Sequence, residues 1–117
     1  MAKILVVDDD ADFREALEEA LRSVGFDVCS ASSADEACRV AVAEPVDVVV
    51  SDIFMPGNGT TLPKRLEILD PPPPVILVTA FEALQVATPD GVFAYLQKPV
   101  AFSQLLRLIE SALAQGA

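Results

Sequence analysis

At 117 residues, 52% of them hydrophobic, the chain is long enough for one domain with a core of its own. A formal net charge of −10 argues against direct nucleic-acid binding, which needs a basic surface. No apolar run approaches the roughly 20 residues of a membrane helix, and the sequence contains no histidine for catalysis or metal binding. Two cysteines, Cys29 and Cys38, lack metal or redox spacing, so we expect reduced thiols and a cytoplasmic location.

Apolar runs alternate with helix-like patterns along the chain, which is typical of an α/β domain with a parallel sheet. Short runs rich in β-branched residues indicate strands that are covered on both faces. The strands are expected at residues 4–7, 26–30, 46–51, 75–79 and about 92–97.

Helix signals separate these runs. The first helix is expected to begin at Asp12, with Glu15 completing a capping box, and to end at Gly25. A second capping box opens the next helix at Ser33. Later helices are expected over residues 62–69, with a proline tolerated in the first turn, and over residues 102–114.

Polar side chains stand where four of the expected strands end. Asp8 and Asp9 follow the first strand, and Asp52 follows the third. Thr79 ends the fourth strand, and Lys98 follows the fifth. Functional groups of an open parallel sheet gather at the carboxyl ends of its strands, so we expect these five residues to lie together. Agreement between separated segments is a stronger signal than any single motif.

The residue types at this edge indicate a divalent metal and a phosphoryl group. Neighbouring carboxylates repel each other, and Mg²⁺, which prefers oxygen ligands and keeps several waters, relieves the repulsion. We expect Asp9 and Asp52 to bind it directly. Asp8, directly or through water, and the backbone carbonyl of Phe54 are expected as further ligands. The metal and the Lys98 ammonium would neutralise charge on a phosphoryl group in transfer to Asp52, the expected nucleophile.

These motifs resemble the receiver domain of two-component response regulators, and the resemblance covers the entire chain. The matching segments, in family order and at near-family spacing, are residues 6–10, 52–57, 78–80 and 98–99. The resemblance implies a flavodoxin-like (βα)5 three-layer sandwich with the strand order 2-1-3-4-5. It also implies a phosphoacceptor signalling domain rather than an enzyme: a sensor histidine kinase or phosphotransfer protein phosphorylates Asp52, and the product hydrolyses slowly by self-catalysis.

The same resemblance implies a switch. Phosphorylation adds roughly −1.5 to −2 charges at Asp52. Thr79 would donate a hydrogen bond to the new group, and Tyr95, the family's switch aromatic, would turn into the vacated space. The surface of the fourth helix, fifth strand and last helix would then change. We expect it to bind a downstream protein target, with a phosphorylation-dependent homodimer as a further option.

Three features depart from the family pattern. The stretch over residues 80–97 is shorter than usual by about one helical turn, so a short, irregular or partly unwound fourth helix is expected. Ala101 stands where the family often has a helix-capping Asp, a loss worth about 1 kcal/mol. Phe54 and Phe81 flank the expected path of the attacking water, and we hypothesise that they slow hydrolysis of the acyl phosphate.

Several interpretations stay open. We favour a stand-alone receiver over residues 1–117 with no effector domain; the alternative is a receiver excised from a DNA-binding regulator or hybrid kinase. An aspartyl-phosphate phosphatase-like enzyme is a remote option, because such enzymes carry an acid two residues after the nucleophile, where Phe54 stands here. A flavodoxin is also disfavoured, because no hydroxyl-rich phosphate loop follows the first strand.

Overall fold

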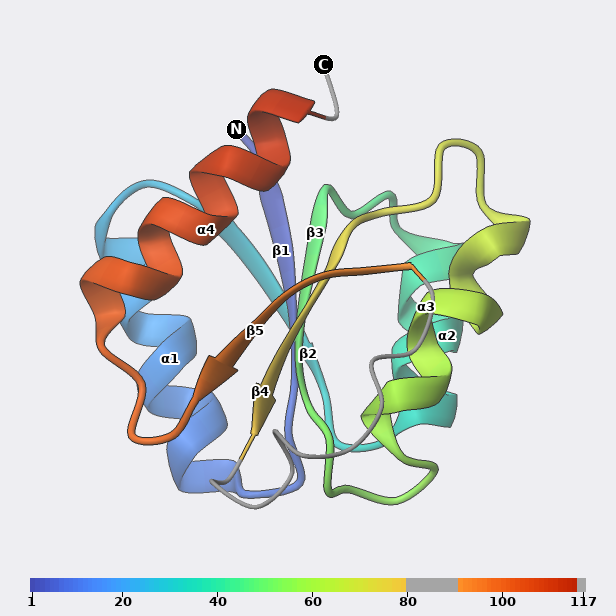
Figure 1. Ribbon diagram of the computed structural model, residues 1–117, viewed down its shortest axis with the longest axis horizontal. Coiled ribbons are helices and arrows are strands. Elements are labelled where there is room, and N and C mark those ends of the chain that lie inside the picture. Colours follow the sequence, from blue (N-terminus) through green and yellow to red (C-terminus); the bar gives the residue numbers. More distant parts are fainter. Residues whose placement is uncertain (80–90, 116–117) are drawn as a thin grey trace.

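A parallel five-stranded sheet forms the centre of the protein (Figure 1). The computed structural model describes residues 1–79 and 91–115. The strands are β1 (Lys3–Val7), β2 (Asp27–Ala31), β3 (Val48–Asp52), β4 (Val75–Thr79) and β5 (Val92–Gln97). All neighbouring strands pair in parallel, in the order β2-β1-β3-β4-β5, which confirms the predicted flavodoxin-like order.

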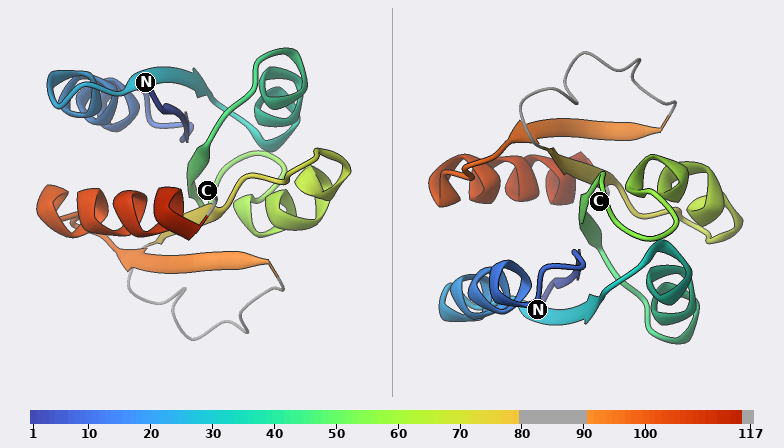
Figure 2. Two further views of the ribbon diagram at one scale, coloured as in Figure 1. Left: turned by 90° about the horizontal axis from the view of Figure 1, so that it is seen from above. Right: turned by 90° about the horizontal axis from the view of Figure 1, so that it is seen from below.

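Helices cover both faces of the sheet, which makes a three-layer sandwich (Figures 1 and 2). Those described are α1 (Ala11–Ser23), α2 (Ala34–Ala43), α3 (Leu62–Arg65) and α4 (Phe102–Gln115), with 3-10 turns η1 (Gly59–Thr61) and η2 (Leu66–Ile68). In both views α1 and α4 lie on one face, and α2 and α3 lie on the other.

Alternate residues of the central strands enter two separate apolar clusters. On the α1 and α4 face the buried members include Ile4, Val6, Leu17, Leu21, Val48, Val50, Ile76, Val78, Leu105 and Ile109. On the α2 and α3 face they include Leu5, Val7, Ala37, Ala41, Val49, Leu62, Leu66, Val75 and Leu77. Because both faces are buried, these strands are continuous apolar runs rather than alternating ones, as a parallel sheet requires.

The start of α1 differs from the expected one. The helix begins at Ala11, and Asp10 is its N-cap: its carboxylate accepts from the backbone N–H groups of Asp12 (3.0 Å) and Phe13 (3.3 Å). The expected start at Asp12 was wrong because Asp10, still in extended backbone, already reaches the first free N–H groups of the helix. The end is as predicted, with Gly25 just past the C-cap at φ +100°.

One of the two hydrogen bonds of the predicted α2 capping box is confirmed. Ser33 is the N-cap, and its hydroxyl accepts from the N–H of Glu36 at 3.1 Å. The Glu36 carboxylate accepts instead from the N–H of Ser32, at 2.6 Å, one residue before the cap. The helix start is therefore fixed from both sides.

The helix expected over residues 62–69 is regular only through Arg65, and η2 replaces its second half. Leu69 then has extended backbone, with ψ 149°. Four prolines, residues 71–74, follow directly after Asp70, and a proline disfavours helical backbone in the residue before it. The third strand also starts later than expected and includes Asp52 as its last residue.

Some expectations fall on residues 80–90, which lie outside the described residues. These are the shape of the fourth helix of the family pattern and the position of Phe81. Among the residues that the structure does describe, no helix is long and apolar enough to cross a membrane.

Candidate functional site

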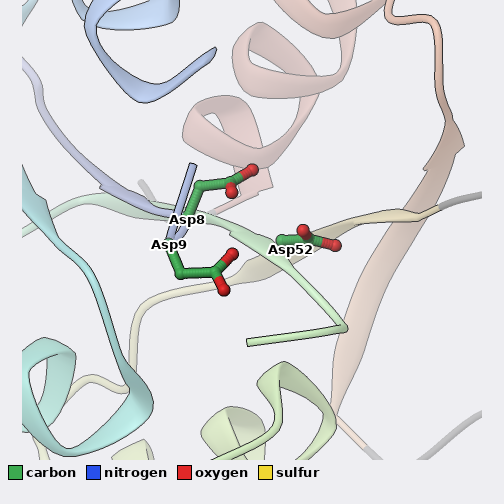
Figure 3. Close-up of side chains that lie close together, drawn as sticks. All are labelled: Asp8, Asp9 and Asp52. Atoms are coloured by element: carbon green, nitrogen blue, oxygen red, sulfur yellow. The ribbon is translucent and has the colours of Figure 1, made fainter. Parts of the chain in front are cut away.

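Three carboxylates converge at the carboxyl ends of β1 and β3 (Figure 3). The two strands are neighbours, with Val7 of β1 opposite Ser51 of β3, so the residues that follow meet at one edge. One oxygen from each of Asp8, Asp9 and Asp52 lies within 4.8 Å of the other two. Asp8 and Asp52 are buried, whereas Asp9 is exposed. The predicted acidic cluster is therefore present, with one ligand open to solvent.

The backbone holds Asp52 in a fixed place. The N–H of Ile53 donates to the carbonyl of Val78 at 3.3 Å, which continues the pairing of β3 with β4 past Asp52. The Ser51 hydroxyl donates to the Asp52 carbonyl at 2.9 Å. Gly59 packs so close that a Cβ there would overlap this same carbonyl oxygen. The carboxylate of Asp52 accepts from the N–H of Phe54 at 3.3 Å.

Asp8 is held by the first turn of α1. Its carboxylate accepts from the N–H of Asp10 at 2.9 Å, and its backbone carbonyl accepts from an Arg14 guanidinium nitrogen at 2.7 Å. Only 1% of the Asp8 surface is exposed. Burial raises the pKa of this carboxyl, and the negative charge of Asp52 adds to the rise, while the Asp10 N–H and Lys98 oppose it. A cation placed between the carboxylates would relieve this penalty.

Lys98 brings its ammonium group to both buried carboxylates. Its Nζ lies 3.3 Å from an oxygen of Asp8 and 3.3 Å from an oxygen of Asp52. Its backbone N–H donates to the Thr79 carbonyl at 2.8 Å, which fixes the residue beside the end of β4. Burial opposes the charged form, but the charges of Asp52 and Asp8 outweigh it and raise the pKa of Lys98. The lysine is therefore a cation at neutral pH.

The remaining predicted residues lie around this centre. Thr79 is fully buried as the last residue of β4. Tyr95 is half-buried in β5 and packs against the cluster on the α2 and α3 face. The surface of Phe54 is 59% exposed beside Asp52. The structure thus brings the carboxylates, Lys98 and Thr79 to one sheet edge, with Tyr95 in the last strand.

Sequence reasoning missed two contacts from α1. The ring of Phe13 lies under the Lys98 ammonium, with Nζ 4.4 Å from the ring centroid, and Arg14 binds the Asp8 carbonyl. The pattern of apolar residues predicted only that Phe13 lies on the buried face of the helix. Its position in the first turn of α1, four residues after Asp9, is the one sequence signal that could have suggested a place at the site.

The donor set suits a small divalent cation. Three carboxylates supply hard oxygen ligands, and the exposed side at Asp9 leaves room for water, which Mg²⁺ usually retains. Beside this cluster, the Lys98 ammonium can contact an anion that is attached to Asp52. The arrangement can therefore place an oxygen nucleophile, a metal and a fixed positive charge around one phosphoryl group.

Comparisons with known proteins agree with this geometry. A family model described as the response regulator receiver domain matches residues 4–110. The C4-dicarboxylate transport transcriptional regulatory protein DctD of Rhizobium meliloti is 38% identical over 113 residues. The transcriptional regulatory protein GlrR of Escherichia coli is 38% identical over 120 residues. These alignments cover 93% and 99% of this chain, but 24% and 27% of the two relatives.

A solved structure extends the comparison to the fold. The crystal structure of a response regulator receiver domain protein from Clostridium thermocellum is 31% identical and has a TM-score of 0.89. The superposition covers 98% of this chain and 96% of that one. The chain spans about a quarter of the length of the curated relatives named above, but nearly all of the chain in this solved structure.

Proposed function

This chain belongs to the response regulator receiver domain family, and from that membership we propose that Asp52 accepts a phosphoryl group in a Mg²⁺-dependent reaction. The observation that carries the proposal is the position of the Asp52 carboxylate, which is fixed by the end of β3 within 3.3 Å of the Lys98 ammonium. Two further carboxylates, Asp8 and Asp9, lie beside it.

The three carboxylates would have different roles in the reaction. Asp8, Asp9 and Asp52, with the backbone carbonyl of Phe54, would hold Mg²⁺, which when bound neutralises charge on the phosphoryl oxygens. One carboxylate oxygen of Asp52 accepts a hydrogen bond from the Phe54 N–H, and the other accepts one from the Lys98 ammonium. Its carboxylate attacks phosphorus, and the bond from phosphorus to the donor breaks with its electron pair leaving on the donor atom. Asp8 is too enclosed, at 1% exposure, to meet a phosphodonor.

Lys98 and Thr79 would hold the product. The Lys98 ammonium already faces Asp52, so it can pair with a phosphoryl oxygen without a large movement. The Thr79 hydroxyl, at the end of the adjacent β4, would donate to another phosphoryl oxygen. Tyr95 would then change its packing and alter the surface around β5. We propose this two-residue switch as the route from Asp52 to a protein partner.

The donor and target are proposed by class. A sensor histidine kinase or phosphotransfer protein would supply the phosphoryl group, and a protein target would bind the switched surface, with no further enzymatic activity required. Both cysteines are free thiols, which supports a reducing, cytoplasmic compartment.

Two arrangements of the whole protein remain as candidates. In one, a receiver over residues 1–117 acts alone on a protein target. The other, a receiver joined to an output domain, is favoured by the relatives, which are named as transcriptional regulatory proteins and are about four times as long as the match. The open reading frame of the natural gene distinguishes them.

Intact mass measurement tests the proposed function. The wild-type chain is incubated with Mg²⁺ and acetyl phosphate, beside Asp52→Asn and a sample of wild type with excess chelator. We expect one hydroxylamine-labile phosphoryl group on the wild type with Mg²⁺ and none in the other two samples. Equal phosphorylation of Asp52→Asn would refute Asp52 as the acceptor, and phosphorylation with chelator present would refute the metal requirement.

A further inference from the structure

The Lys98 ammonium has an aromatic neighbour as well as two acidic ones. Its Nζ lies 4.4 Å from the centroid of the Phe13 ring and 3.3 Å from an oxygen of each of Asp8 and Asp52. A cation over the face of a ring at this distance is attracted by the electron density of the ring, more strongly where water is partly excluded. About 28% of the Lys98 side chain is exposed, so the contact is partly shielded from solvent.

The ring itself is held from two sides. Phe13 lies in the first turn of α1, where its N–H donates to the N-cap carboxylate of Asp10 at 3.3 Å. Its half-buried side chain packs against the apolar cluster under α1 and α4. The ring is therefore a fixed surface, whereas lysine has a flexible four-carbon stem that needs partners to keep it in place.

The acidic partners change during the proposed reaction, and the ring does not. A metal at the cluster would bind the Asp8 and Asp52 carboxylates, which now pair with Lys98, and phosphorylation would turn the Asp52 carboxylate into an acyl phosphate. The Phe13 ring is a neutral group and takes no part in metal binding or in the bond to phosphorus. It is thus a contact that can hold Lys98 beside the phosphoryl group throughout transfer.

We propose that Phe13 is a positioning residue for phosphoryl transfer, and that it acts by holding the Lys98 ammonium over its ring. The inference rests on the proposed function, because it assigns Phe13 to the same reaction at Asp52. It does not require Phe13 to touch the phosphoryl group. We therefore expect the Phe13 ring to affect the rate of phosphorylation only when Lys98 is present.

The first test measures the rate of phosphorylation by acetyl phosphate at saturating Mg²⁺. Phe13→Leu keeps an apolar side chain but removes the ring, and we expect the rate to fall by about three- to ten-fold. Phe13→Tyr keeps the ring and is expected to react within about two-fold of wild type. Phe26→Leu is the matched control: it removes a partly buried ring from the same cluster and should leave the rate unchanged.

A double substitution separates positioning from general loss of stability. In the Lys98→Ala background, adding Phe13→Leu should cause no further loss of rate, because the group that Phe13 holds is already gone. A purely structural role would slow both backgrounds by the same factor. NMR gives a readout free of the reaction: the Lys98 ε-methylene protons should be shifted upfield by the ring in wild type and Phe13→Tyr, and not in Phe13→Leu.

The results of these experiments distinguish a failure of the Phe13 role from a failure of the proposed function. If wild type takes no phosphoryl group, the proposed function fails and the role of Phe13 in transfer fails with it. If wild type is phosphorylated and Phe13→Leu reacts at the wild-type rate, only the Phe13 inference is overturned. It is also overturned if Phe13→Leu slows the reaction by the same factor in the wild-type and Lys98→Ala backgrounds, or if wild type shows no ring-induced shift at Lys98.

Discussion

The two strand ends that build the site hold their carboxylates in different ways. At the end of β3 the backbone itself fixes Asp52, which is still part of the strand and lies against Gly59. At the end of β1 the strand has already stopped at Val7, and the first turn of α1 fixes Asp8 through the Asp10 N–H and the Arg14 side chain.

This difference matches the roles that we propose. An attacking oxygen gains most from a fixed position, because small displacements cost much of the rate. Metal ligands can adjust, since Mg²⁺ completes its shell with water. The β3 end should therefore tolerate substitution poorly in both stability and reaction, whereas the β1 end should show its effects mainly through the metal.

The largest expected effect comes from Gly59→Ala at the β3 end. No Cβ fits between Gly59 and the Asp52 carbonyl, so the loop or the strand must move, and overpacking of this kind costs about 1–3 kcal/mol or more. Urea unfolding should show this loss, and the phosphorylation rate should fall as well. Gly25→Ala is the control, because its φ of +100° is strained for alanine far from the site. It should lower stability without lowering the rate per folded molecule; equal loss of rate would contradict the account.

Removing a metal ligand at the β1 end should alter the response to Mg²⁺. At a concentration 100 times its dissociation constant, a ligand that binds only the folded state adds about 2.7 kcal/mol to the free energy of unfolding. Asp9→Asn should lose most of this gain while folding normally without metal, because Asp9 is exposed. Thermal unfolding with and without Mg²⁺ measures the effect. Asp12→Asn, an exposed acid on α1 outside the cluster, should keep the full response.

The stability of metal-free Asp8→Asn should depend on pH differently from that of wild type. Burial raises the Asp8 pKa above 3.8, so the folded state binds this proton more tightly than the unfolded state. Proton binding by Asp8 therefore stabilises the folded state fully below pH 3.8, and this stabilisation is lost as the pH rises through the higher pKa of Asp8 in the folded state. Asn cannot ionise, so the variant should unfold at higher urea than wild type at pH 7, and the difference should shrink towards acid pH. A variant less stable than wild type at pH 7 would contradict this.

The smallest expected effect concerns the exposed Phe54. Its ring stands beside Asp52 and is hypothesised to obstruct the water that hydrolyses the acyl phosphate. Phe54→Asn should shorten the lifetime of the phosphorylated chain severalfold and leave stability nearly unchanged. The measurement is the decay of phosphoprotein after removal of the donor. A lifetime equal to that of wild type would reject the hypothesis.

The family resemblance supplied the strand order, and the positions of the polar residues at strand ends predicted that the site residues lie together. Asp8, Asp52 and Lys98 lie next to strand ends, and the topology of a parallel sheet brings such ends together whatever the details of the helices. Their roles in phosphoryl transfer stay predictions. The sequence therefore shows well which polar residues lie at the ends of strands.

Details of the helices and of contacts between distant segments were less accessible. The N-cap at Asp10 was missed because Asp10 and Asp12 can both cap a helix, and Glu15, three residues after Asp12, favoured the later one. The contact of Phe13 with Lys98 joins the first helix to the end of the last strand, and no local pattern encodes such a pairing.

We propose that the carboxylate fixed by β3, and not those following β1, is the nucleophile. Borohydride reduces an aspartyl phosphate to homoserine, so reduction of the phosphorylated chain followed by peptide sequencing by mass spectrometry locates the modified residue directly. The account predicts homoserine at position 52 alone, and only in samples phosphorylated with Mg²⁺. Homoserine at position 8 or 9, or at several positions, would contradict it.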